Sequence, residues 1–260
     1  MRGFGKRDSA LIKMSQRLKL TVAYEGAAFA GWQSQTHRNA VQDKLEHAFQ
    51  KISGTRIRVH GAGRTDAGVH ALAQCAHVDL PDRRLSVQRW TDALNAVLPR
   101  AVRILRCHYV SQNFHARFSA TGKLYRYRIW AAPILPPLEL GRAWHIHTPL
   151  HVDLLKAAGE KFVGTHDFAA FAADRGKKAN DTTRTIWSVR VRRSGPRVTI
   201  EISGDGFLYK MVRLMVGAMT RVALNKMKAD EITARLKSGR ADGSRFVAPA
   251  EGLYLVKVWY

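Results

Sequence analysis

The order of strand-like and helix-like segments constrains the fold of this chain more than any other feature. Apolar residues alternate in short runs, which predicts strands, and recur at three- and four-residue spacing in longer runs, which predicts helices. In the first half the predicted order is strand, helix, strand, strand, helix and strand, at residues 17–24, 39–53, 57–60, 73–80, 86–98 and 101–110. This order is typical of a ferredoxin-like α+β layer, with helices on one face of a mostly antiparallel sheet.

The second half repeats a similar order of elements. It holds predicted strands at 118–130, 142–147, 183–193, 197–203 and 248–260, and predicted helices at 152–163, 205–225 and 230–238. Asn39, Ser86 and Asp230 are predicted to cap three of the helices, because short polar side chains accept hydrogen bonds from free backbone N–H groups.

The repetition predicts an α+β fold with two similar ferredoxin-like subdomains, whose mixed, mostly antiparallel sheets flank a basic cleft. We place the first subdomain at residues 17–117 and the second at 118–260. Residues 1–16 are basic and lack the apolar run of a signal peptide, which predicts a flexible tail; a transit peptide is the alternative.

The charge of the chain favours a polyanionic partner. Lysine and arginine total 43 and aspartate and glutamate total 20, which leaves a net charge of +23. Nucleic acid is the leading candidate for this partner, and an anionic membrane surface is the second. The longest apolar stretch, 207–224, carries Lys210, Arg213 and Arg221, so we expect no membrane span. The alternative to a polyanionic partner is a solvated basic surface that binds nothing.

The glycine-rich segment 61–68, GAGRTDAG, presents a lone carboxylate, Asp66, next to Arg64. Three interpretations compete. A dinucleotide-binding loop is disfavoured, because Asp66 occupies the place of the third glycine and the residues at 73–80 alternate like a strand. A structural turn, with Asp66 bonding its own backbone, is common. A catalytic carboxylate kept ionised by an adjacent cation is the third.

The cysteines and histidines of the chain give weaker indications of function than this loop. Cys75 and Cys107 lie far apart and outside any Cys-x-x-Cys pattern, which fits a reducing compartment such as the cytoplasm and gives no zinc site. His145 and His147 share a strand face, which a metal ion or simple surface polarity would explain. The adjacent pair at 166–167, His-Asp, resembles a catalytic pair, but no nucleophilic serine or cysteine is suggested nearby, so we interpret it as structural.

Segment 61–71, GAGRTDAGVHA, resembles the signature loop of the tRNA pseudouridine synthase A family. Further segments are similar to motifs of that family and extend the resemblance over residues 17–260: they lie at 24–33, 164–168, 207–213 and 248–255. Two small departures are Glu25, where the family usually has aspartate, and Lys210, where it often has histidine or asparagine.

The resemblance implies a role for five residues. Asp66 would be the nucleophile, Arg213 would pair with it, and Arg64 would help to displace the target base. Tyr125 would stack on the flipped uracil and can accept the proton of its carbon 5, and Leu253 would form an apolar wall. The residues alone leave open phosphate contacts for both arginines and a core position for Leu253.

The activity implied is isomerisation of uridine to pseudouridine at positions 38–40 of the tRNA anticodon stem–loop, without a cofactor or metal, by a homodimer. Arginines interleaved with aromatic residues at 118–130 suit RNA, because rings stack on bases and guanidinium groups meet phosphates. One rival is a non-catalytic RNA-binding or tRNA-folding protein of the same fold. A glycosidase or nucleotide-binding enzyme is another, but it would lack the usual second carboxylate and leave the charge unexplained.

Overall fold

The computed structural model describes residues 16–36, 38–81, 85–173, 181–240 and 246–260. The predicted flexible tail lies outside the described residues except for Gln16, and so does most of the polar loop that begins at residue 174.

Within the described residues the strands form one ten-stranded, mostly antiparallel sheet. The strands are β1 (Gln16–Tyr24), β2 (His60–Gly61), β3 (His70–Leu80), β4 (Val102–Val110), β5 (Gly122–Ala131), β6 (Trp144–Ile146), β7 (Gly164–Asp167), β8 (Thr183–Ser194), β9 (Arg197–Gly204) and β10 (Leu253–Trp259). Their order is β4-β1-β3-β10-β5-β9-β8-β7, with β2 also paired to β3 and β6 to β5. The expected α+β class and mostly antiparallel sheet are confirmed.

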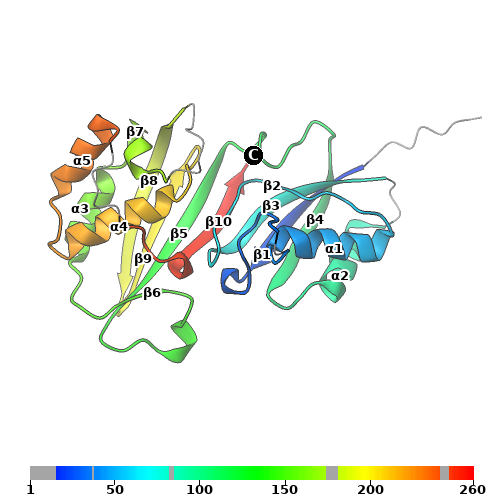
Figure 1. The fold of residues 1–260 in the computed structure, drawn as a ribbon, viewed down its shortest axis with the longest axis horizontal. Helices are drawn as coiled ribbons and strands as arrows, with labels where there is room; N and C mark the ends of the chain where they lie inside the picture. The colour runs from blue at the N-terminus through cyan, green and yellow to red at the C-terminus, as the bar shows by residue number, and fades with distance from the viewer. Residues whose placement is uncertain (1–15, 37, 82–84, 174–180, 241–245) are drawn as a thin grey trace, which may run out of the picture.

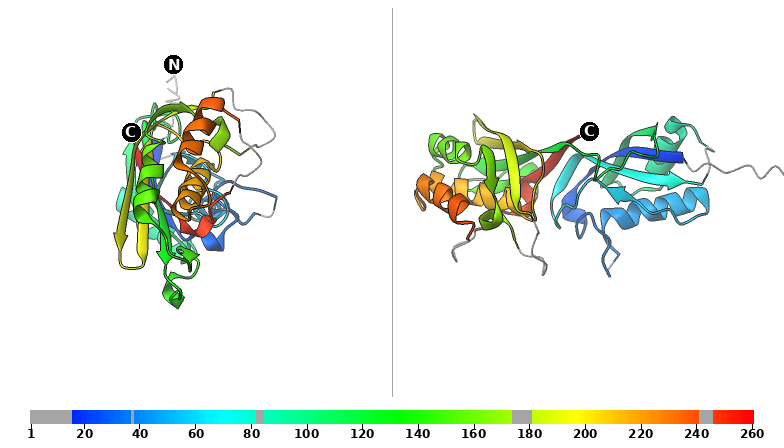
Figure 2. Two further views of the ribbon diagram at one scale, coloured as in Figure 1. Left: turned by 90° about the vertical axis from the view of Figure 1, so that its left-hand side faces the viewer. Right: turned by 90° about the horizontal axis from the view of Figure 1, so that it is seen from above.

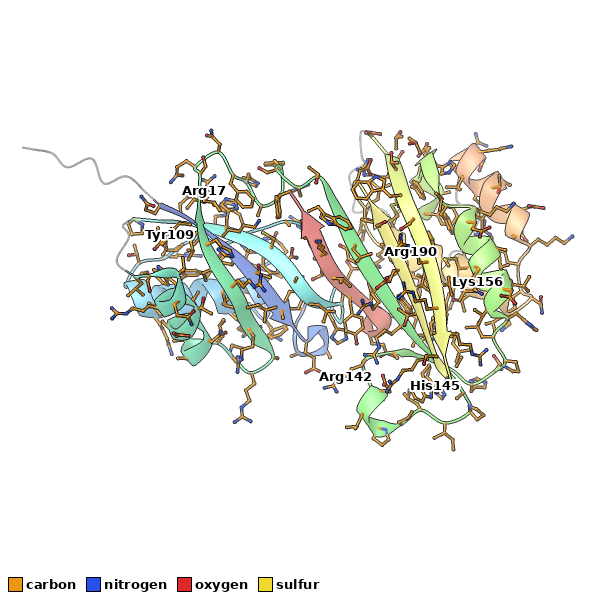
Figure 3. The ribbon with its side chains drawn as sticks, turned by 180° about the vertical axis from the view of Figure 1, so that it is seen from behind. Arg17, Tyr109, Arg142, His145, Lys156 and Arg190 are labelled. Atoms are coloured by element: carbon orange, nitrogen blue, oxygen red, sulfur yellow. The ribbon has the colours of Figure 1, made fainter. Side chains whose placement is uncertain are left out.

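The helices gather at the two ends of this sheet. They are α1 (Val41–Ser53), α2 (Val87–Val97), α3 (Val152–Glu160), α4 (Met211–Ala223) and α5 (Ala229–Ser238). Figure 1 shows α1 and α2 over the first half of the chain and α3, α4 and α5 over the second, and the view from above in Figure 2 shows the two groups at opposite ends of an elongated molecule. Seen from behind, β8 and β9 lie in front of α4, with Arg190 on the face that α4 does not cover (Figure 3).

Each half of the sheet has the strand order of a ferredoxin-like layer. The first runs β1-α1-β2-β3-α2-β4 along the chain and β4-β1-β3-β2 in space. The second, apart from the added elements β6, β7 and α5, runs β5-α3-β8-β9-α4-β10 along the chain and β10-β5-β9-β8 in space. The halves join because one edge of β3 has two partners. Its first residues pair in parallel with Tyr254 and Leu255 of β10, and its later residues pair with β2.

One main apolar core runs through both halves, since the inward faces of the strands pack under the helices. Leu18, Leu20 and Val22 alternate on β1 and are fully buried, as are Tyr127 on β5 and Met215 on α4. Burying each such side chain stabilises the fold by about 1.5–3 kcal/mol. The alternation that predicted the strands is therefore the pattern that builds this core.

Two predicted helix caps are wrong, and the third is confirmed. Ser86 caps α2 by accepting from the backbone N of Arg89 at 3.3 Å. Asn39 lies one residue before the N-cap of α1 and donates to the Ala28 carbonyl instead. Asp230 lies inside the first turn of α5, whose N-cap is Lys228. At both ends a different acid, three residues after the cap, bonds the N-cap backbone: these acids are Asp43 and Glu231.

The ends of several predicted elements also change. The helix expected from residue 205 begins at Met211, because Lys210 before it has a left-handed φ of 58°. The predicted strand at 57–60 shrinks to β2, the one at 142–147 to β6, and the helix at 152–163 ends at Glu160. The short strand β7 was not predicted. Of the residues lost from the start of α4, those at 207–210 line the site described next.

Candidate active site

A pocket of about 700 Å³ opens at the seam between the two halves of the sheet. Because β10 pairs with only the start of β3, the strands that meet there leave room beyond that point. The lining residues come from both halves of the chain. The longest stretches are 58–66 and the segment 207–213 that leads into α4; strand β5, the start of β10, and residues near 32, 42, 69 and 115–118 supply the others. Neither half of the chain could form this pocket alone.

The loop that carries Asp66 is held from below by the segment after β1. Trp32 donates its backbone N–H to the Thr65 carbonyl at 3.1 Å, and the Thr65 hydroxyl lies 2.7 Å from the Tyr24 hydroxyl. Gly31 has a φ of +93°, and a Cβ atom there would lie 2.7 Å from the Thr65 carbonyl oxygen. The glycine therefore lets the two segments meet, and this contact fixes the backbone next to Asp66.

Asp66 and Arg213 face each other across the pocket. Nη1 of Arg213 lies 3.0 Å from Oδ2 of Asp66, although the two residues are 147 positions apart in the chain. The side chains are 14% exposed for the arginine and 19% for the aspartate. The guanidinium is held in turn by a 2.7 Å bond from its Nε to the Ala248 carbonyl. A cation fixed at this distance holds the carboxylate in one orientation through a charge-assisted hydrogen bond.

Tyr125 and Leu253 form the apolar wall of the pocket. Both line it and both are nearly buried, with 8% and 5% of their surface exposed. The Tyr125 ring meets Phe207 edge-on, with centroids 5.1 Å apart. Burial, with smaller effects from the Tyr24 phenol and the Asp66 carboxylate, raises the pKa of Tyr125. The phenol is therefore neutral at physiological pH.

Arg64 lies at the exposed mouth of the pocket. Its Nε donates to Gln33 at 3.2 Å, and the Gln33 amide donates to Gln42 at 2.6 Å. Gln42 is itself buried on α1. This chain of amides directs an exposed guanidinium over the opening.

The pocket is strongly cationic. Among the described residues that line it, Asp66 is the lone carboxylate. The lining cations are Arg58, Arg64, Arg117, Lys123, Lys210 and Arg213. Because a pocket with apolar walls concentrates the field of such charges, it attracts a polyanion.

Sequence reasoning missed Lys123 and the contact between Tyr24 and Thr65. Lys123 lies two residues before Tyr125 on β5 and therefore shares its face, and this spacing was the available signal. Nothing in the local sequence marks Tyr24, because its partner is 41 residues away.

The other candidate residues lie outside the pocket. Asp167 accepts from the backbone N of Ala169 and from the Thr182 hydroxyl, which are contacts that hold a turn. Nε2 of His145 lies 2.8 Å from the Ala132 carbonyl. The described residues contain no cluster of three or more potential metal ligands. In the same part of the chain, no helix has the length and apolarity to cross a bilayer.

The fold and the site together define a class of protein: an α+β protein that presents one arginine-paired carboxylate in a cationic cleft. The model of a family described as "tRNA pseudouridine synthase" matches residues 20–119 and 158–260. The chain belongs to this family. Asp66, Arg64, Arg213 and Leu253 lie within the matched segments, and Tyr125 lies between them.

Curated relatives match nearly the whole chain. It is 48% identical over 251 residues to "tRNA pseudouridine synthase A" of Akkermansia muciniphila, which covers 94% of this chain and 95% of the relative. It is 40% identical over 245 residues to the protein of that name from Acetivibrio thermocellus, covering 94% of this chain and 100% of the relative. For the protein from Solidesulfovibrio magneticus, identity is 42% over 251 residues, covering 94% and 91%.

Proposed function

We propose that this protein isomerises uridine to pseudouridine in tRNA, with Asp66 as its catalytic carboxylate. The observation that carries the proposal is the Asp66–Arg213 pair, which lies in a cationic pocket against the Tyr125 ring. Family membership supports the same reaction.

The reaction needs little more than the pocket offers. The bond between N1 of uracil and C1′ of ribose breaks, the base turns, and C5 joins C1′. C5 loses a proton and N1 gains one, so the atoms balance without an oxidant or an added group. Asp66 can add to the uracil ring, or stabilise an oxocarbenium-like sugar as carboxylates do in glycosidases.

Each of the other site residues has a role in this proposal. Arg213 holds the Asp66 carboxylate in place and directs it into the pocket. Tyr125 stacks on the flipped uracil, and Leu253 closes the wall beside it. A neutral phenol is a weak base, so stacking suits Tyr125 better than accepting the carbon 5 proton. Arg64, exposed at the mouth, takes the place of the extracted base.

We further propose that the substrate uridines are positions 38–40 of the anticodon stem–loop, that the protein acts in the cytoplasm, and that it works as a homodimer. These follow from the resemblance of the signature loop. The division into subdomains at 17–117 and 118–260 belongs to the same proposal, and the repeated strand order on either side of β10 supports it.

The test is pseudouridine mapping on an unmodified tRNA transcript with the wild-type protein and Asp66→Asn. We expect product on the 3′ side of the anticodon stem–loop with the wild type, and a loss of at least about 10³-fold in rate for the variant. Asp153→Asn is the matched control, because that carboxylate lies on α3, is 96% exposed and pairs with Lys156.

Turnover that persists in Asp66→Asn would contradict the nucleophile assignment. Tight tRNA binding without product from any variant would point instead to a non-catalytic RNA-binding protein. Product at other uridines would keep the reaction and overturn the substrate position.

A further inference from the structure

Lys123 is a charged side chain in the pocket wall that the proposed reaction does not use. It lies on β5 between Gly204 of β9 and Val258 of β10, and it shares the pocket-facing side of the strand with Tyr125. Its side chain is partly buried.

No acidic partner offsets this charge. In the described parts of the chain Lys123 has neither an ion pair nor a hydrogen bond. The carboxylates on the neighbouring segments have other partners: Glu201 of β9 pairs with Arg126, Asp205 accepts from the backbone N of Thr185 at 3.0 Å, and Asp66 pairs with Arg213. An enclosed ammonium group without an acceptor is costly, so its presence calls for a ligand.

The charged groups around Lys123 are themselves cations. Arg117, which precedes β5, and Arg184, on β8, both act electrostatically on the lysine. Arg184 lies 3.8 Å from the Asp181 carboxylate, whereas no such partner is found for Arg117 among the described residues. His115 lines the same end of the pocket, but burial lowers its pKa, so the ring is uncharged at neutral pH. Lys257 lies over the ring of Trp259. We call Arg117 and Lys123, which both line the pocket, the cation cluster.

The lysine tip also contacts the loop that carries Asp66. A Cβ atom on Gly63 would lie 2.9 Å from Nζ of Lys123. The backbone of Gly63 does not have a positive φ, so its angles do not require glycine. The ammonium group therefore lies against the backbone of the loop at Gly63, and this contact ties Lys123 to the catalytic loop.

Enclosure makes the charge of Lys123 easy to remove. Burial, followed by Arg117 and Arg184, lowers its pKa to about 8. At neutral pH the side chain is still mostly charged, and one unit above pH 8 it is mostly neutral. A bound anion would restore its charge, because an opposite charge favours the ionised form.

We propose that the cation cluster binds a backbone phosphate of the RNA substrate, next to the extracted nucleotide. This inference rests on the proposed function and deepens it. A phosphate has the oxygens and the negative charge that Arg117 and Lys123 lack, whereas a neutral uracil carbonyl would leave their charges uncompensated. The contact with Gly63 places this phosphate against the loop that presents Asp66.

Proton uptake then accompanies RNA binding above pH 8. In free protein Lys123 loses its proton as the pH rises through about 8, and in the complex it keeps the proton to higher pH. Linkage therefore makes the wild-type affinity fall by about tenfold between pH 7 and pH 9, if the pKa in the complex exceeds about 10.

The test measures binding of an unmodified tRNA transcript at constant ionic strength from pH 7 to pH 9, for the wild type, Lys123→Arg and Lys123→Met. Arginine stays charged throughout this range. Lys123→Arg should therefore bind like the wild type at pH 7, and its affinity should not fall between pH 7 and pH 9. Lys123→Met should bind about tenfold more weakly at pH 7, with its salt slope reduced by about one, and should also lose the fall.

The matched control is Lys156→Met, which removes an exposed lysine of α3 outside the pocket (Figure 3). It should keep the wild-type affinity and pH profile. All variants meet the same RNA, so titration of the RNA itself cancels in the comparison.

An equal pH dependence in the wild type and Lys123→Arg would overturn the proposal, as would wild-type affinity in Lys123→Met. A protein that binds no tRNA at any pH would instead contradict the proposed function. A protein that forms pseudouridine while Lys123→Met binds normally would keep the function and remove this phosphate site.

Discussion

The two ends of the pocket differ in whether their positive charge is compensated within the protein. At one end Arg213 pairs with Asp66 and donates to a backbone carbonyl, so its charge is compensated within the protein. At the other, Lys123 lies between strands with only cations for charged neighbours. The comparison teaches that a compensated arginine prepares a reactive carboxylate, whereas an uncompensated lysine prepares a place for an anion from outside.

The chemistry of the two side chains fits this division. Arginine stays charged when enclosed and offers several donors in fixed directions, which suits holding one carboxylate in one orientation. Lysine changes its pKa readily when enclosed, so its charge responds to what binds. Four changes would break or sharpen the comparison, and we take them from the largest expected effect to the smallest.

Removing the arginine breaks the compensated end. We expect Arg213→Ala to lower kcat by about 10²–10³-fold, because Asp66 loses both its orientation and its counter-charge. The affinity for tRNA should change little. Single-turnover kinetics with a separate binding measurement separate the two, and Arg213→Lys should recover part of the rate. A similar loss in rate and in affinity would make Arg213 a phosphate contact.

Adding a carboxylate would turn the uncompensated end into a compensated one. Val258 is the register partner of Lys123 on β10, so Val258→Glu places an acid beside the ammonium group. We expect a fall in tRNA affinity of more than about tenfold, since the new carboxylate occupies the cation cluster and repels phosphate. Val258→Gln, with nearly the same shape and no charge, is the control. An equal effect of both variants would show that packing is the cause.

Substitutions of Tyr125 test whether this residue acts by stacking its ring on uracil or by accepting a proton. If the ring stacks on uracil and the neutral phenol is no base, Tyr125→Phe should keep kcat within about threefold. Tyr125→Leu should lose considerably more, because it removes the ring. Rates measured from pH 6 to pH 9 provide the check: a large loss in Tyr125→Phe would restore the role of proton acceptor.

The smallest effect concerns stability. Lys123→Met should be more stable than the wild type at pH 7 by on the order of 1 kcal/mol, or about 2–4 °C in Tm, because it removes an enclosed unpaired charge. The folded-state pKa lies below the ordinary value of 10.5, so the unfolded state binds more protons between pH 8 and pH 10.5. The wild type therefore gains stability as the pH rises over that range, and the difference in stability between Lys123→Met and the wild type becomes smaller. Thermal unfolding at pH 7 and pH 9.5 measures it, and a less stable variant at pH 7 would indicate a structural role.

The strands were predictable because their pattern is local. Alternation on β1 and β5 follows directly from one face packing into the core, and the repeated order of elements already indicated two ferredoxin-like layers. The cap at Ser86 was predictable for the same reason. Asn39 and Asp230 are equally good caps by residue type, but Asn39 donates to the Ala28 carbonyl and α5 begins before Asp230, with Lys228 at its N-cap.

By itself the sequence determined the charge of the chain, the two halves, and the loop that presents Asp66, since each depends on residues close together in the chain. Only the tertiary structure decided what Asp66 and Lys123 meet. The pairing of Asp66 with Arg213 spans 147 residues, and the exposure of a charge depends on every element packed around it. For that reason two basic residues that look alike in the sequence became, in the fold, a compensated cation and an uncompensated one.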